Sequence, residues 1–107
     1  MFLSVIIPAY NEEKRIKNTL ISVSDYLSKQ SYDYEIIVVN DGSSDRTAET
    51  VLSLKPQVPD LRLIDNKENH GKGAVVKQGM LEARGEIRLF TDADNSTSID
   101  HIEKILT

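Results

Sequence analysis

Apolar residues along the chain alternate between short runs typical of strands and longer stretches with helical spacing. The short runs are rich in branched residues and predict strands at 2–8, 34–40, 61–66 and 86–91. In the stretches between them, apolar residues recur every three or four positions and predict helices at 11–29, 45–54 and 73–84, with a further helical segment from about Ser98. Strand and helix therefore follow one another along the whole chain.

Residues with known capping preferences set the predicted helix boundaries. Asn11 suits the N-cap of the first helix, and Glu12 favours the positive end of its dipole. Gly85 is well placed to end the third helix. In the second helix the residues expected to face the core are Ala48, Val51 and Leu52.

The repeated strand–helix order predicts an α/β fold. Three strand–helix units followed by a fourth strand favour right-handed crossovers and a mostly parallel sheet with helices on both faces, a three-layer sandwich. A chain of 107 residues is long enough for one hydrophobic core, so we expect a single domain spanning 1–107.

A polar cluster follows each predicted strand. The clusters are 10–12, 41–43, 69–72 and 92–94. Ligands of parallel α/β sheets bind beyond the carboxyl ends of the strands, and these ends lie along one edge. We therefore expect the four clusters to gather on one rim, which favours a binding site over four unrelated turns.

Two carboxylates, Asp92 and Asp94, stand on either side of Ala93 where the fourth predicted strand ends. In an extended chain, residues two apart point the same way. Two like charges held so close are costly unless a cation lies between them, so the pair is a candidate site for Mg²⁺ or Mn²⁺. The alternative is that Asp92 caps a turn and Asp94 caps the helix that follows.

The other clusters contain groups that could hold a nucleotide. Asp41 can accept a hydrogen bond from a base or a ribose hydroxyl, and Glu12 could bind a ribose hydroxyl. Gly71 and Gly73 flank Lys72, whose ammonium could face a phosphate. Each group also has a structural alternative. Asp41 could belong to an Asp-Gly turn, Glu12 could be a charge in the first turn of a helix, and the loop around Lys72 could be a flexible turn before a helix.

Composition narrows the classes of function. The net charge of −4, without a basic stripe, gives no reason to expect nucleic acid as a partner. The absence of cysteine excludes disulfides and thiolate metal sites. No apolar run approaches the about 20 residues of a membrane span, and strand-like sequence begins at Phe2, so we expect no signal peptide. We expect a cytoplasmic chain, at the cytoplasmic face of a membrane in a full-length protein.

Four motifs, in their order and spacing, resemble those of a known family. They are VIIPAYNEE (5–13), VVNDGSSDRT (38–47), NHGKGAV (69–75) and TDADNST (91–97). Together they resemble family-2 glycosyltransferases of the GT-A fold, in particular the dolichyl-phosphate glucosyltransferases and related polyprenyl-phosphate sugar transferases. The resemblance covers only the nucleotide-binding half of such enzymes and implies the sheet order 3-2-1-4.

The resemblance also implies roles for the matching residues. The residues that would line the nucleoside pocket are Pro8, Ala9, Tyr10 and Glu12, with Asp41 recognising the base. The loop formed by Gly71, Lys72 and Gly73 would lie near the base and the diphosphate. The catalytic and metal-binding pair would be Asp92 and Asp94, with Asp92 and Ala93 near the ribose or sugar and Asp94 as the principal metal ligand.

The implied reaction is the transfer of a hexose from a nucleotide-sugar, assisted by Mg²⁺ or Mn²⁺, to an acceptor such as a polyprenyl or dolichyl phosphate. The first expectation for the donor is UDP-glucose and the second is GDP-mannose. The acceptor pocket belongs to the part of the family that this chain does not match. The alternative is therefore a non-catalytic nucleotide-binding or assembly module. An unpaired edge on the fourth strand would favour a homodimer.

A phosphotransferase of the haloacid dehalogenase type is a second alternative, because it also uses an Asp-x-Asp pair. That chemistry places the pair after the first strand and needs a lysine and an acidic cluster later in the chain. Here the pair follows the fourth predicted strand, and only thirteen residues come after Asp94. The order of the elements therefore disfavours this reading.

Overall fold

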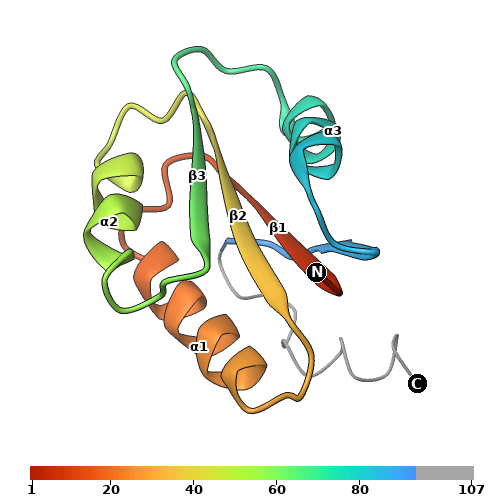
Figure 1. Ribbon diagram of the computed structural model, residues 1–107. Coiled ribbons are helices and arrows are strands. Elements are labelled where there is room, and N and C mark those ends of the chain that lie inside the picture. Colours follow the sequence, from red (N-terminus) through yellow and green to blue (C-terminus); the bar gives the residue numbers. More distant parts are fainter. Residues whose placement is uncertain (94–107) are drawn as a thin grey trace.

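The computed structural model describes residues 1–93, which form an α/β sandwich (Figure 1). The four strands are β1 (Leu3–Ala9), β2 (Tyr34–Asp41), β3 (Leu61–Asn66) and β4 (Ile87–Phe90). The helices are α1 (Ile16–Ser28), α2 (Thr47–Leu54) and α3 (Lys72–Glu82). All strand pairs are parallel, and the sheet order is β3-β2-β1-β4. The predicted parallel sheet and its order are confirmed. The helical segment predicted from about Ser98 lies outside the described residues.

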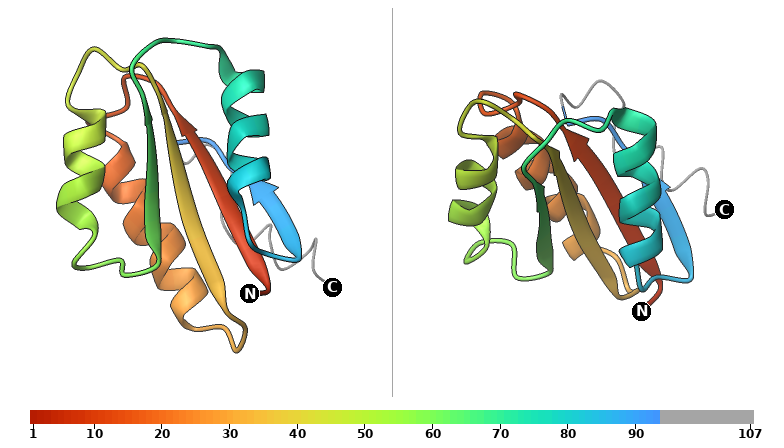
Figure 2. Two further views of the ribbon diagram at one scale, coloured as in Figure 1. Left: turned by 45° about the horizontal axis from the view of Figure 1, so that its top comes forward. Right: turned by 90° about the horizontal axis from the view of Figure 1, so that it is seen from above.

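The helices cover both faces of the sheet, α1 and α2 on one side and α3 on the other (Figure 2). Alternate residues of β1 enter the two cores: Leu3, Val5 and Ile7 pack with α1 and α2, whereas Ile6 packs with Val75 of α3. Every residue of β1 is buried. Burial on both faces explains why β1 and β2 have continuous apolar runs instead of alternating apolar and polar residues.

Gly79 brings α3 close to the sheet. A Cβ atom at this position would lie 2.6 Å from Cγ2 of Ile6 and 3.2 Å from Cγ2 of Val39. A glycine inside a helix costs about 1 kcal/mol relative to alanine. Here its lack of a side chain lets the helix backbone approach β1 and β2 more closely than any other residue would allow.

The first helix does not begin at Asn11, so that predicted N-cap is wrong. Asn11 has φ +54°, and α1 begins at Ile16 after Arg15, which makes no side-chain capping bond. The Asn11 side chain instead accepts a hydrogen bond from the Ser44 amide at 2.8 Å, and the Asn11 amide donates to Ser43 Oγ at 2.9 Å. Asn11 therefore ties the loop after β1 to the loop after β2.

Two details of α2 also differ from the prediction. The helix begins at Thr47, because the Asp45 carboxylate accepts the Thr47 amide hydrogen at 3.0 Å and so lies ahead of the first turn. Burial raises the pKa of Asp45, but the hydrogen bonds from Thr47 and Glu13 outweigh it and hold the pKa below its usual value. Leu52 was expected in the core and is 50% exposed, whereas Val51 is fully buried.

Gly85 does not end α3, contrary to the prediction. The helix stops at Glu82, and Ala83 is already extended, with ψ 145°. A Cβ atom on Gly85 would lie 2.6 Å from the Ser4 amide nitrogen, so this glycine allows the chain to pass close to β1.

None of the described helices is long and apolar enough to cross a membrane.

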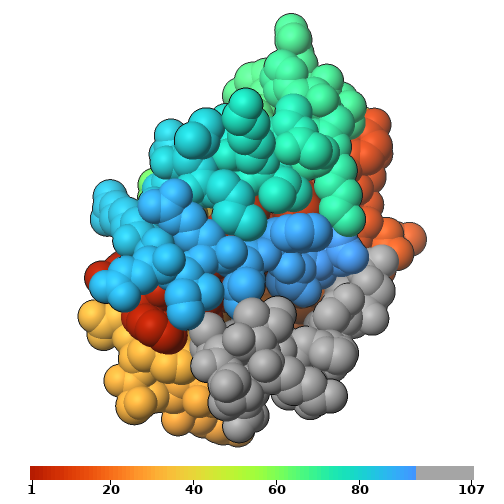
Figure 3. Space-filling view, turned by 90° about the vertical axis from the view of Figure 1, so that its right-hand side faces the viewer, coloured from red at the N-terminus to blue at the C-terminus, as the bar shows by residue number. Residues whose placement is uncertain are grey.

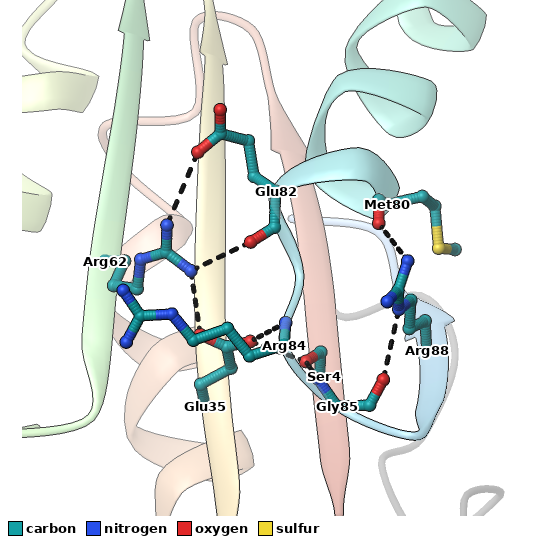
Figure 4. Close-up of polar contacts among 8 residues, drawn as sticks. All are labelled: Ser4, Glu35, Arg62, Met80, Glu82, Arg84, Gly85 and Arg88. Carbon is teal, nitrogen blue, oxygen red and sulfur yellow. Dashed lines mark hydrogen bonds and ion pairs between the residues drawn. The ribbon is translucent and has the colours of Figure 1, made fainter. Parts of the chain in front are cut away.

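A polar cluster around the buried Glu35 carboxylate ties the α3–β4 connection to the sheet (Figure 4). Glu35, which is 2% exposed, accepts hydrogen bonds from Ser4 Oγ at 2.6 Å, from the Arg84 amide at 2.7 Å and from Arg62 Nη1 at 2.9 Å. Burial raises the pKa of Glu35, but these bonds and the Arg62 charge outweigh it and lower the pKa. We call Ser4, Glu35, Arg62 and Arg84 the Glu35 cluster.

The Glu35 cluster lies at the amino ends of the strands, because Ser4, Glu35 and Arg62 are each the second residue of their strand. Arg88 strengthens the same connection by donating to the carbonyl oxygens of Gly85 at 3.1 Å and Met80 at 2.7 Å (Figure 4). Charge-assisted hydrogen bonds therefore stabilise the amino end of the sheet, opposite the carboxyl edge where ligands of such sheets bind.

Candidate functional site

The loops after β1, β2 and β4 meet the start of α3 at the carboxyl edge of the sheet. They enclose a cavity of about 320 Å³. Its lining residues are Pro8, Ala9, Tyr10, Glu12, Asp41, Lys72, Val75, Asp92 and Ala93. Eight of these nine are residues that the sequence motifs had singled out. Segments that are far apart in the chain thus reach one cavity.

Two of the singled-out residues, Gly71 and Gly73, are not among the described residues that line this cavity. Gly71 and Gly73 flank Lys72, and Gly71 touches the cavity wall through its hydrogen bond to Asp41. Asp94, the expected principal metal ligand, lies outside the described residues. Val75 was missed by the sequence reasoning. It stands three positions after Lys72, and this helical spacing places both on the same face of α3.

Asp41 holds the loop that precedes α3. It is 4% exposed, and its carboxylate accepts the His70 amide hydrogen at 2.6 Å and the Gly71 amide hydrogen at 3.1 Å. Asn69 Nδ2 donates to the Asp41 carbonyl oxygen at 3.3 Å. The residue expected to recognise a base therefore also fixes the loop that carries Lys72. Base recognition by Asp41 stays a prediction.

Glu12 presents a buried oxygen without a protein partner in the described part of the chain. Its Oε1 atom pairs with the Arg15 guanidinium, whereas its Oε2 atom is buried and accepts no hydrogen bond from residues 1–93. The Glu12 backbone is held by a hydrogen bond from its amide to Thr47 Oγ1 at 2.9 Å. An unsatisfied buried acceptor costs about 1–3 kcal/mol. This cost favours a ligand that donates a hydroxyl hydrogen here.

Lys72 and Asp92, which both line the cavity, form an ion pair. The distance between Lys72 Nζ and Asp92 Oδ1 is 2.5 Å, and the ammonium lies 5.7 Å from the centre of the Phe90 ring. Both side chains are partly exposed, Lys72 at 59% and Asp92 at 36%. The described part of the cavity lining thus combines three carboxylates, from Glu12, Asp41 and Asp92, with one ammonium.

The residues at this edge fit a divalent cation only in part. Within residues 1–93, no three His, Cys, Asp or Glu side chains are grouped closely enough to hold a metal ion. However, the Asp92 carboxylate already contacts a cation, the Lys72 ammonium. Mg²⁺ is commonly held by one or two carboxylates together with substrate phosphates, so Asp92 suits an ion that arrives with a diphosphate.

The sequence profile of one protein family matches most of the chain. The family is described as Glycosyl transferase family 2, and the match covers residues 4–107. Dolichyl-phosphate beta-glucosyltransferase ALG5A of Trichomonas vaginalis is 43% identical, over 96% of this chain and 33% of that protein. The dolichyl-phosphate beta-glucosyltransferase of Drosophila melanogaster is also 43% identical, over 96% of this chain and 34% of that protein. The chain spans about a third of the length of these relatives.

Solved structures share the fold. S. aureus TarS 1-349 in complex with UDP-GlcNAc superposes with a TM-score of 0.79 and 31% identity, over 99% of this chain and 30% of that one. The mannosyltransferase PcManGT of Pyrobaculum calidifontis, in complex with GDP-Man and Mn²⁺, superposes with a TM-score of 0.74 and 33% identity, over 86% of this chain and 27% of that one.

Proposed function

The chain belongs to glycosyl transferase family 2, and from that premise we propose that it is the donor-binding part of a metal-assisted hexosyltransferase. One observation carries the proposal: loops from three strands and the start of α3 surround a single cavity at the carboxyl edge. Its volume of about 320 Å³ lies within the range of small-molecule sites. Ligands of parallel α/β sheets bind at this edge.

UDP-glucose is the donor we propose first, and GDP-mannose second. The relatives of similar sequence are dolichyl-phosphate beta-glucosyltransferases, which supports glucose as the sugar. TarS was solved with UDP-GlcNAc and PcManGT with GDP-Man, so both bases occur with this fold. We further propose a dolichyl or other polyprenyl phosphate as the acceptor, which would place the complete protein at the cytoplasmic face of a membrane.

Six of the nine described lining residues have a chemical task in this proposal. Pro8, Ala9 and the Tyr10 ring flank the nucleobase, and Glu12 Oε2 accepts a ribose hydroxyl hydrogen. Lys72 faces the diphosphate, and Asp92 holds Mg²⁺ or Mn²⁺. The metal, when bound, stabilises the negative charge that develops on the departing diphosphate. A phosphate acceptor is already ionised at neutral pH, so this chemistry needs no general base from the chain.

A titration of nucleotides with and without Mn²⁺ tests this function. We expect UDP and UDP-glucose to bind the chain at least about tenfold more tightly with Mn²⁺, a difference of about 1.4 kcal/mol, because the cavity lining is negatively charged. Calorimetry would give the affinities. GDP-mannose is the competing ligand, and tighter binding of GDP-mannose would replace UDP-glucose as the donor.

A transfer assay with polyprenyl phosphate separates enzyme from binding module. Metal-dependent UDP binding without transfer by this chain supports the alternative of a non-catalytic nucleotide-binding module, which its length of about a third of its relatives keeps open. Failure to bind any of the three nucleotides with Mn²⁺ would reject both readings.

We also propose that the outer edge of β4 joins two copies of the chain. Within residues 1–93, β4 pairs with β1 on one side and is the last strand of the sheet. α3 and β4, coloured teal and blue, lie side by side at the surface in Figure 3. Phe90, a residue of β4, is 51% exposed, and an apolar edge without a partner strand among residues 1–93 favours pairing with another strand.

Sedimentation equilibrium tests the homodimer. We expect a dimer at tens of micromolar and a monomer for Phe90→Asp, because the added charges oppose each other across a shared edge. Leu81→Asp is the matched control, since Leu81 is 74% exposed and belongs to α3 and not to β4. A wild-type chain that stays monomeric at high concentration would show that the edge does not pair.

A further inference from the structure

We propose that Lys72 is an exchangeable counter-ion that couples metal binding to nucleotide binding. In the structure its ammonium contacts the Asp92 carboxylate, one of the groups that the proposed function assigns to the divalent ion. The inference rests on the proposed nucleotide-sugar function. Besides contacting the phosphates, Lys72 would then have a second role, which is to regulate the access of the divalent ion to Asp92.

The backbone of Lys72 is fixed while its side chain is free to change partner. Lys72 is the first residue of α3, and Gly71 before it has φ +93°. The Gly71 amide donates to the buried Asp41 carboxylate, which anchors the loop. The Lys72 side chain is 59% exposed, and its flexible aliphatic stem lets the ammonium move without moving the helix.

The charges of the cavity give the exchange its driving force. Among residues 1–93, three carboxylates and one ammonium give the lining an excess of negative charge, and a nucleotide diphosphate adds more. Like charges at short distance repel strongly where water is partly excluded, so the diphosphate needs cations beside it. Lys72 can neutralise Asp92 or a phosphate group. A divalent ion competes with Lys72 for the same carboxylate.

These competing contacts make the two ligands favour each other. Without nucleotide, Lys72 lies on Asp92 and weakens metal binding there. When a diphosphate enters, it attracts the ammonium and leaves the Asp92 oxygen to the metal. Because coupling between two sites is reciprocal, the metal must also raise the affinity for the nucleotide. Since the Lys72–Asp92 pair is partly exposed, we expect Lys72 to change metal affinity by only about two- to fivefold.

Binding of Mn²⁺ alone tests this role, followed by the signal of free Mn²⁺ in electron paramagnetic resonance. We expect Lys72→Met to bind Mn²⁺ about two- to fivefold more tightly than the wild type when no nucleotide is present. Methionine keeps an unbranched apolar stem but has no charge. Lys72→Arg keeps the charge and should behave like the wild type. Thermal unfolding of each variant controls for loss of structure.

Two further measurements test whether the change in Mn²⁺ affinity arises from movement of the Lys72 ammonium between Asp92 and the diphosphate. Saturating UDP should raise Mn²⁺ affinity more in the wild type than in Lys72→Met, because only the wild type has an ammonium to move. In an Asp92→Asn background, Lys72→Met should give no gain in Mn²⁺ affinity. Both comparisons measure metal binding without any transfer activity.

Mn²⁺ affinity that is unchanged or weaker in Lys72→Met would overturn the inference, and so would absence of Mn²⁺ binding by every variant. Mn²⁺-dependent UDP binding with equal coupling in wild type and Lys72→Met would overturn the counter-ion role and leave the proposed function intact. Conversely, a gain in Mn²⁺ affinity in Lys72→Met without any UDP binding would support the Lys72–Asp92 competition and reject the nucleotide function.

Discussion

Glu35→Gln is expected to lower the free energy of unfolding at pH 7 by about 2 to 4 kcal/mol, because it removes the charge from a buried and fully bonded carboxylate. Glu35 accepts hydrogen bonds from Ser4, Arg62 and Arg84. Glutamine has the same shape, but its side-chain NH₂ group would face groups that donate hydrogen bonds to Glu35 in the wild type. The substitution also leaves the Arg62 guanidinium without its buried negative partner. Urea unfolding of both proteins measures the difference.

The difference between wild type and Glu35→Gln should depend on pH. The folded-state pKa of Glu35 is lowered, so the stabilisation is fully present above the unfolded-state pKa of about 4.3. It is lost as the pH falls from that value through the folded-state pKa. The two stabilities should therefore converge in acid, and the wild type should show the steeper loss.

Glu82→Gln is the matched control for Glu35→Gln. Glu82 Oε2 contacts the same guanidinium, Arg62, at 3.4 Å, but its side chain is 54% exposed (Figure 4). Exposed ion pairs contribute about 0 to 1 kcal/mol, so this variant should stay close to the wild type. Equal effects of the two substitutions would contradict a special role for the buried carboxylate.

Gly42→Ala should cost about 2 to 4 kcal/mol of stability and weaken UDP binding as well. Gly42 has φ +69°, which L-residues adopt only with strain. A Cβ atom here would lie 2.5 Å from the carbonyl carbon of Glu68 and 2.6 Å from the amide nitrogen of Asn69. Both are backbone atoms, so relief requires the loop that carries Lys72 to move. Urea unfolding and a UDP titration with Mn²⁺ check the two effects.

Gly73→Ala provides the control for the glycine substitution. A Cβ atom at Gly73 would meet nothing within 4 Å, and its φ is not positive. Alanine is favoured over glycine in helices by up to about 1 kcal/mol, so this variant should be as stable as the wild type or more stable. A Gly42→Ala protein with wild-type stability would show that the loop containing Glu68 and Asn69 shifts at little cost in free energy, contrary to this prediction.

The first two strands were predictable because the apolar runs of β1 and β2 are buried on both faces of a parallel sheet, whereas β3 and β4 are only partly buried. The predicted run 61–66 coincides with β3, and the other three agree with β1, β2 and β4 to within one residue at each end. The start of α1 was not predictable. Asn11 suits a helix cap and a loop contact equally well, and the choice depends on Ser43 and Ser44, over thirty residues further along the chain.

The sequence motifs predicted most of the residues that line the cavity, but not the hydrogen bonds and ion pairs among them. Strand order alone brings the motifs to one edge, which explains the lining of the cavity. The bonds from the loop amides to Asp41 and from Lys72 to Asp92 join loops that are separated by twenty residues or more. Their geometry depends on side-chain directions. A signal for the Glu35 cluster was present, because a charge inside a buried run needs a partner.

The central claim is that loops from separate strands form one nucleotide site at the carboxyl edge of the sheet. Titration of the ¹⁵N-labelled chain with UDP and Mg²⁺, followed by amide chemical shifts, tests it most directly. We expect the shifted amides to be those at 9–12, 41–42, 69–73 and 92–93, and those of the Glu35 cluster at the opposite end to stay unchanged. Shifts confined to the Glu35 cluster, or no shifts at the carboxyl edge with saturating UDP and Mg²⁺, would contradict the claim.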